Sequence, residues 1–116
     1  MIESSKIIEF LEKTKSTQAN YQFIVLRDLI KHNVRSKDDL LETLNDANPK
    51  RPEKITWSNT PVFKVLENKK FIVVYHKGHI QKNFKLTAKE KRHALKEIKR
   101  ILKIKADPCS NQYTKN

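Results

Sequence analysis

The chain has 116 residues, of which 37% are hydrophobic and 33% are charged, and it carries a formal net charge of +12 at pH 7. This length allows one hydrophobic core of ordinary size but not two, and no apolar run approaches the roughly 18 residues that would span a bilayer. Cys109 is the only cysteine, and the N-terminal segment lacks the pattern of a signal peptide, so we expect a cytoplasmic protein with no membrane partner.

Two helices are predicted before residue 34. The first covers about residues 4–15, where apolar residues recur at helical spacing behind Ser4 or Ser5 as the N-cap. The second begins near residue 20 with the segment YQFIVLRDLI and stops at His32-Asn33, where we expect a left-handed residue because asparagine tolerates positive φ. Its apolar residues occupy more than one stripe, so we expect this helix at the centre of the core.

Ser36 begins the next predicted helix. Asp39 follows it three residues later, in a variant of the capping box, and only about three residues separate this helix from the one before. Such a short turn forces the two helices to cross at an angle. The helix ends before the loop 48–54, which contains two prolines and which we expect to be basic and exposed.

A short fourth helix is predicted at about residues 58–68. Ser58, Asn59 or Thr60 can serve as its N-cap, and Pro61 suits its first turn because a proline there loses no helical hydrogen bond. The apolar residues that follow at helical spacing indicate one inward face. We expect this helix to end at Asn68 or Lys69.

The β-rich runs FIVVY and QKNFKL, joined by HKGH, predict a hairpin over residues 71–86. Gly78 is the only glycine of the chain, and we expect it to form a two-residue turn with Lys77, since such turns need a positive φ. One face of the hairpin is expected to lie on the helices through Phe71, Val73, Tyr75, Phe84 and Leu86.

A last helix is predicted over about residues 88–105. Thr87 and Glu90 form a capping box at its start, and Asp107-Pro108 stops it before a polar tail that covers residues 107–116. Its apolar stripe needs a partner, which is either the first helix of the same chain or a symmetry mate in a homodimer formed through the first and last helices; the stripe consists of Leu95, Ile98, Ile101 and Leu102. We expect a single domain over residues 1–106.

The order of these elements and the passage LENKKFIVVY resemble the winged helix-turn-helix superfamily, over about residues 20–86. In many of its members a leucine-glutamate-x-x-glycine-hydrophobic passage joins the recognition helix to the wing. Lys70 stands where such proteins commonly have glycine, so either Asn68 or Lys69 takes the left-handed position or the helix ends differently. The expected fold is mainly α with a small β-hairpin, a winged helix-turn-helix with an added N-terminal helix and a basic C-terminal helix.

The charge distribution favours a polyanionic ligand. Residues 1–54 contain ten Lys/Arg against nine Asp/Glu, and residues 55–116 contain fifteen against four, so the two parts carry +1 and +11. Such asymmetry is typical of nucleic-acid binding, although a lysine-rich surface can also serve solvation alone. The resemblance implies sequence-preferring binding to double-stranded DNA, as in transcriptional regulators, with helix 58–68 in the major groove and wing 71–86 on the backbone or minor groove.

Ten residues are candidate nucleic-acid contacts. Asn59 suits a bidentate contact with adenine, and Lys64 suits guanine or phosphate, whereas the neighbouring hydroxyls can equally be helix caps. Trp57 beside them is more simply interpreted as a core residue. The full set is Lys50, Arg51, Ser58, Asn59, Thr60, Lys64, His76, Lys77, His79 and Lys82.

Three alternative functions are compatible with the same predicted fold. The span from YQFIVLRDLI to FKL is also similar to winged-helix segments of restriction-type endonucleases, so the chain can be the DNA-reading module of such a system. The positive second half suits an RNA- or ribosome-associated winged helix equally well. A winged helix that binds another protein is the third, and it predicts no salt-dependent binding to nucleic acid.

No enzyme is expected, because the sequence offers neither a nucleophile with a base beside it nor a Gly-rich phosphate loop. A metal nuclease would need Asp46 and Glu67 at the edge of a sheet, and Glu67 falls on a predicted helix. We also expect no metal and no cofactor, since the possible zinc ligands lack a second clustered pair; they are His76, His79, His93 and Cys109.

Overall fold

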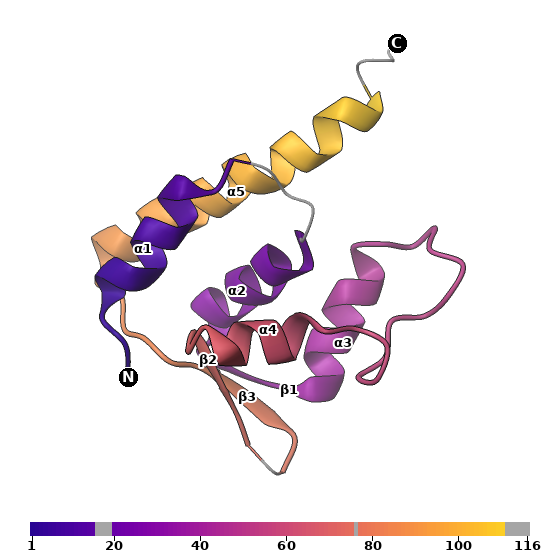
Figure 1. The fold of residues 1–116 in the computed structure, drawn as a ribbon, viewed down its shortest axis with the longest axis horizontal. Coiled ribbons are helices and arrows are strands. Elements are labelled where there is room, and N and C mark those ends of the chain that lie inside the picture. Colours follow the sequence, from indigo (N-terminus) through magenta and orange to yellow (C-terminus); the bar gives the residue numbers. More distant parts are fainter. Residues whose placement is uncertain (16–19, 76, 111–116) are drawn as a thin grey trace.

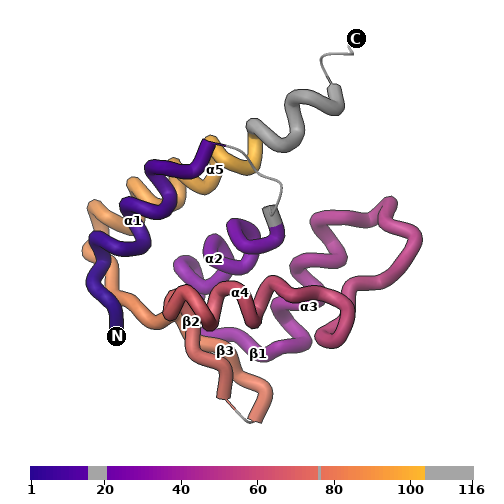
Figure 2. Tube along the Cα trace, in the orientation of Figure 1, coloured from indigo at the N-terminus to yellow at the C-terminus, as the bar shows by residue number. Residues whose placement is uncertain are grey.

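The structure is a computed structural model that describes residues 1–15, 20–75 and 77–110 (Figures 1 and 2). These residues form five helices and a small antiparallel sheet of three strands, so the fold is mainly α with a little β. The elements in chain order are α1 (Ser4–Lys13), α2 (Asn20–His32), β1 (Val34–Ser36), α3 (Lys37–Asp46), α4 (Val62–Asn68), β2 (Ile72–Val74), β3 (His79–Lys82) and α5 (Ala88–Ser110).

Helix α2 lies at the centre, between α5 on one side and the sheet on the other (Figure 1). The consecutive residues 23–26 are all buried, so more than one face of the helix is covered, as its apolarity predicts. Asn33 ends it with φ = 68° and donates its N–H to the Leu29 carbonyl at 2.7 Å, which confirms the predicted left-handed stop. One continuous core joins α2 to the other four helices and to the sheet.

Helix α3 begins as its sequence predicts. The Ser36 hydroxyl accepts the N–H of Asp39 at 3.0 Å, which satisfies one of the backbone donors that a helix leaves open at its start. Asn45 then holds the chain that follows the helix. Its amide nitrogen donates to the Ile55 carbonyl at 3.0 Å, and its amide oxygen accepts the Ile55 N–H at 2.8 Å. This pair of bonds returns the chain toward α3 and positions the approach to α4.

Helices α1 and α5 run side by side in the same direction (Figure 1). The start of α1 does not use the predicted Ser4 or Ser5 cap, because Glu3 occupies the cap position without a side-chain bond and Ser4 donates to Glu90 at 2.9 Å instead. At the other end, the Arg100 guanidinium donates to the carbonyls of Leu11 and Thr14 at 3.0 and 3.2 Å. Long-range polar contacts therefore hold the helix pair near both of its ends, and a contact of 2.8 Å between His93 and Glu12 joins the two helices between them.

Helix α5 buries its apolar side against α1 and α2 of the same chain. Ala94, Ile98 and Ile101 are buried, whereas Leu95 and Leu102 are half-buried, so the stripe is centred slightly away from the predicted one. Its capping box is confirmed, since the N–H of Thr87 donates to Glu90 at 2.9 Å and the N–H of Glu90 donates to Thr87 at 3.1 Å.

The predicted stop of α5 at Asp107-Pro108 is wrong, because the helix continues to Ser110. A proline fixes φ near the helical value and removes one hydrogen bond, so it weakens a helix without excluding it. The predicted polar tail 107–116 is thereby shortened at its start, and residues 111–116 lie outside the described residues.

The sheet contains a strand that the sequence did not predict. β1 pairs with β3, and β3 pairs with β2, both antiparallel, so β3 is the middle strand. The strand β3 also starts at His79, earlier than the run QKNFKL indicates. The predicted buried face is therefore only partly right: Phe71 and Phe84 are buried, but Tyr75 is exposed, and the buried residues within the strands are Ile72 and Ile80.

Gly78 lies in a longer turn than the predicted two-residue one. The Tyr75 N–H donates to the His79 carbonyl at 2.8 Å, and the Gly78 N–H donates to the Tyr75 carbonyl at 3.0 Å. Gly78 has φ = 87°, as the last residue of a three-residue hairpin loop often has. Its own carbonyl accepts the Lys37 N–H at 2.7 Å, which ties the hairpin loop to the first turn of α3.

Candidate nucleic-acid interface

Helix α4 runs directly into the hairpin through a left-handed lysine. Lys70 itself has φ = 67°, so the first of the two predicted alternatives, a left-handed Asn68 or Lys69, is wrong. The Phe71 N–H donates to the Leu66 carbonyl at 3.1 Å and the Lys70 N–H to the Glu67 carbonyl at 2.9 Å. These two bonds form a Schellman motif, and Leu66 and Phe71, the positions at which such motifs usually place a hydrophobic contact, are both buried.

The segment before α4 carries a stack of three side chains. The Trp57 ring lies 4.7 Å from the ring of buried Phe63, nearly parallel to it, and the Lys37 ammonium lies 4.2 Å from the Trp57 ring centroid. Trp57 is 37% exposed, so it is not the buried core residue that we expected. Because Lys37 also bonds Gly78 through its backbone, this stack and the hairpin loop belong to one continuous surface.

Asn59 is not free to read a base, because its side chain shapes the loop. Its amide oxygen accepts the Thr56 N–H at 2.8 Å, and its amide nitrogen donates to the Lys54 carbonyl at 2.9 Å and to Glu53 at 3.3 Å. It also precedes α4, which begins at Val62 and not at the predicted residue 58. An adenine contact would therefore require Asn59 to exchange all these bonds.

The hydroxyls beside Asn59 are weakly engaged. Ser58 is exposed, with its hydroxyl 3.3 Å from that of Thr56, and the Thr60 hydroxyl accepts the Val62 N–H at a long 3.4 Å. Thr60 is half-buried beside Pro61, which holds the N-cap position of α4 with no side-chain cap. Of these two hydroxyls, that of Ser58 belongs to the more exposed residue.

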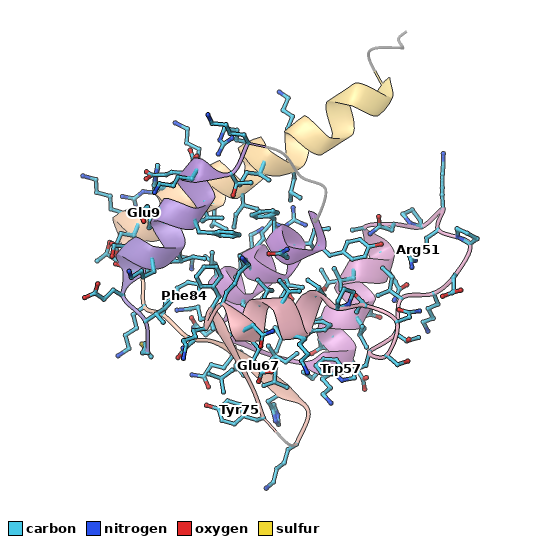
Figure 3. The ribbon with its side chains drawn as sticks, viewed as in Figure 1. Glu9, Arg51, Trp57, Glu67, Tyr75 and Phe84 are labelled. Atoms are coloured by element: carbon cyan, nitrogen blue, oxygen red, sulfur yellow. The ribbon has the colours of Figure 1, made fainter. Side chains whose placement is uncertain are left out.

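Lys64, Lys77 and His79 are exposed on α4, on the hairpin loop and at the start of β3. His76, the fourth candidate of this region, lies outside the described residues. The outward side of α4 is of mixed charge, because Glu67 is exposed one turn after Lys64 (Figure 3). The basic character of this surface therefore comes from several elements and not from α4 alone.

Lys82 does not belong to the hairpin tip. It pairs with Ile72 at the base of the hairpin and donates from its ammonium to the Phe84 carbonyl at 2.9 Å. Partial burial lowers the pKa of Lys82, and the nearby charges of Lys91 and Lys85 lower it further. Its predicted place at the outward hairpin tip is therefore wrong.

The loop that carries Lys50 and Arg51 lies at another end of the molecule. Figure 3 shows Arg51 and Tyr75 well separated, with Trp57 between their positions. Lys50 and Arg51 are exposed, and the Arg51 guanidinium donates to the Glu53 carbonyl at 2.9 Å and to the Tyr21 hydroxyl at 3.2 Å. The sequence thus predicts an exposed basic loop correctly, but this loop does not adjoin the hairpin.

Two features of this side were missed in the sequence. A shallow groove on the outer face of the sheet is lined by Val34, Tyr75, Lys77, His79 and Gln81, and it exposes two large apolar side chains, Val34 and Tyr75. A second groove, along α3, is lined by the acidic residues Asp38, Asp39, Glu42 and Asp46. Lys54 also lines this second groove, so its four carboxylates against one lysine leave it with a net negative charge.

Comparisons with known proteins returned no match: no family model, no curated protein and no solved structure is significantly similar to this chain. Among the described residues, no group of three or more His, Cys, Asp or Glu side chains could hold a metal ion. No described helix is both long and apolar enough to cross a membrane.

Proposed function

We propose that this chain binds double-stranded DNA with a sequence preference, as a transcriptional regulator built on a winged helix-turn-helix arrangement. The observation that carries the proposal is the junction at Lys70, where α4 ends in a left-handed residue at the position that commonly holds glycine in that family. The strand order β1-β3-β2 around the hairpin is also compatible with a wing. On this proposal α4 approaches the major groove and the hairpin approaches the adjacent backbone.

The surface formed by the start of α3, the start of α4 and the hairpin loop has the chemistry that DNA binding requires. Lys37, Lys64, Lys77 and His79 supply positive charge or hydrogen-bond donors from four separate segments, and Trp57 offers a partly exposed aromatic ring. Phosphate contacts from such residues orient a protein on the duplex, and base-edge contacts give the preference. We assign Lys64 to the groove and Lys77 to the backbone.

A duplex selected from a random-sequence pool tests this proposal. Binding is measured by fluorescence anisotropy at several salt concentrations, and we expect the logarithm of the association constant to fall by about 0.9 per logarithmic unit of salt for each phosphate neutralised. Lys64→Ala should weaken binding and reduce the preference for the selected duplex, whereas Lys77→Ala should weaken binding to all duplexes alike.

Lys13→Ala is the matched control, because Lys13 is the exposed last residue of α1, and that end of α1 lies away from the hairpin (Figure 1). A salt-independent affinity, or equal effects of all three substitutions, would contradict the proposed interface.

RNA is the second candidate ligand, and the exposed Tyr75 favours it. Tyr75 is 48% exposed beside Lys77 and His79, and an aromatic side chain next to cations can stack an unpaired base. Competition between the selected duplex and single-stranded or structured RNA at one fixed salt concentration separates the two. Preferential displacement of the duplex by RNA would reassign the ligand, and Tyr75→Ala should then weaken RNA binding more than Lys64→Ala does.

A further inference from the structure

The outward face of α5 carries a regular line of cations. Five exposed residues follow one another at intervals of three, four, three and four positions: Lys89, Arg92, Lys96, Lys99 and Lys103. An α-helix turns by 100° per residue, so these five lie within about 80° of one another around its axis. We call them the α5 stripe.

The α5 stripe is directed away from the rest of the molecule. The same helical geometry sets its centre roughly opposite the buried residues Ala94, Ile98 and Ile101, which face α1 and α2. The two acidic residues of this part of the helix are engaged elsewhere, Glu90 with Thr87 and Ser4, and Glu97 with Arg100. Within the described part of the chain, no salt bridge joins a stripe residue to an acidic side chain.

The dimensions of the α5 stripe fit a nucleic-acid backbone. Lys103 lies 14 residues after Lys89, so with a rise of 1.5 Å per residue the stripe is about 21 Å long. A duplex presents about 12 phosphate charges over that length. Four of the five residues are lysines, which bind phosphate as point charges, and none is an Asn or Gln that could read adenine. The partner that this surface fits is therefore a phosphate backbone contacted without regard to sequence.

An anionic membrane fits the α5 stripe less well. A helix that lies in a membrane interface inserts an apolar face beside its basic one. The apolar face of α5 is instead covered by α1 and α2. A lipid surface would thus meet charge alone, with no apolar side chains of the stripe to insert.

We infer that the α5 stripe binds the backbone of a second duplex segment, so that one protein molecule bridges two segments of DNA. Helix α2 lies between α5 and the sheet (Figure 1), and the stripe is directed away from α2, so one straight duplex on α4 and the hairpin does not reach it. The inference rests on the proposed function for the class of ligand. It adds a second contact surface with a different, sequence-independent mode.

A bridging assay tests the inference separately from single-duplex binding. The selected duplex is fixed to beads, and capture of a second, fluorescent duplex of unrelated sequence is measured as a function of protein concentration. We expect capture by the unchanged protein. Glutamine substitution of all five stripe residues should abolish capture, while binding to the selected duplex alone keeps its sequence preference. Glutamine is a good helix former and the five positions are exposed, so the helix should persist, which circular dichroism checks.

A matched variant removes the same charge elsewhere, by glutamine substitution of five exposed lysines outside α5: Lys6, Lys13, Lys15, Lys31 and Lys54. Capture that survives in this control and is lost in the stripe variant supports the inference. Equal capture by both variants, or no capture by the unchanged protein, overturns it and leaves single-duplex binding standing. If the unchanged protein bound no duplex at all, the proposed function would be refuted as well. If the stripe were required for binding to phosphatidylserine vesicles and no duplex were captured, the stripe would be assigned to lipid.

Discussion

Lys70 offers the sharpest test of the structure, because its φ of 67° is a conformation that L-residues other than asparagine and aspartate adopt reluctantly. The left-handed conformation costs a residue with a Cβ about 1–2 kcal/mol. Glycine does not have this cost, but its freedom in the unfolded chain costs about 0.5–1 kcal/mol. We therefore expect Lys70→Gly to raise the free energy of unfolding by about 0.5–1 kcal/mol relative to Lys70→Ala.

The neighbouring Lys69 is the control, because it has the ordinary helical values φ = −78° and ψ = −6°. There the left-handed strain is absent, and Lys69→Gly should be less stable than Lys69→Ala by about 0.5–1 kcal/mol. Comparison with alanine at each position removes the loss of the lysine side chain, including the contact of Lys69 with the Phe10 ring. The unfolded-state cost of glycine then cancels between the two positions, so the gap between the two differences equals the left-handed strain, about 1–2 kcal/mol.

Urea unfolding of the four variants, with a common slope against denaturant, measures these differences. Opposite signs at residues 69 and 70 are expected. If the glycine variant were less stable than the alanine variant at both positions, α4 would not end at a left-handed Lys70. The proposed function would then lose the observation that carries it.

Three further predictions concern other parts of the fold. Arg100→Lys should lower the free energy of unfolding, measured by urea unfolding, by about 1 kcal/mol, because one ammonium cannot reproduce the two guanidinium bonds that cap α1. Arg92→Lys on the exposed face is the control and should change this free energy little. The Thr87 N–H, and after it the Ser4 hydroxyl, hold the pKa of Glu90 below its ordinary value, so its contribution to stability is present above the unfolded-state pKa and is lost as the pH falls through the folded one. Glu90→Gln should thus flatten the acid side of a plot of unfolding free energy against pH, and parallel plots would count against this assignment. Gly78→Ala should lower the free energy of unfolding by about 0.5–1 kcal/mol, the left-handed strain less the cost of glycine in the unfolded chain, because a Cβ there meets nothing within 4 Å; a much larger loss would indicate a clash.

Local signals in the sequence predicted helix boundaries well where a side chain and its backbone partner are three residues apart. Ser36 with Asp39 and Thr87 with Glu90 are such pairs: the first forms the N-cap bond, and the second forms both bonds of its capping box. Asn33 belongs to the same class, because asparagine tolerates positive φ without help from distant residues. These elements needed no knowledge of the tertiary structure.

The remaining elements depend on partners far along the chain. Val34 to Ser36 become a strand only because residues 79–81 lie beside them, and three residues are too few to show a strand pattern. Lys70 has no intrinsic preference for positive φ, and its carbonyl is held by the Asn83 amide at 2.9 Å. The register of the hairpin likewise follows from Tyr75 pairing with His79, which placed β3 earlier than its composition indicated.

The candidate site was predictable in residue type but not in orientation. Lys64, Lys77 and His79 are exposed as expected, because charged side chains on short elements reach solvent with few constraints. Asn59 suits an adenine contact and an internal loop contact equally, and the path of residues 53–56 decides for the latter. Lys37 could not be recognised at all, because its place beside Trp57 arises from the packing of α3 against the segment before α4.

The position of β3 in the middle of the sheet sets an order of events during synthesis. β1 and β2 both precede their shared partner, so neither can complete its pairing until residue 82 has left the ribosome, and α1 waits longer still for α5. A nascent chain that ends before residue 79 has two unpaired strands and an uncovered face of α1. Non-local pairings of this kind slow folding and leave aggregation-prone intermediates with exposed strand edges and hydrophobic surface. Translation pauses before residue 79 should therefore lower the yield of folded protein more than pauses after α5 is complete.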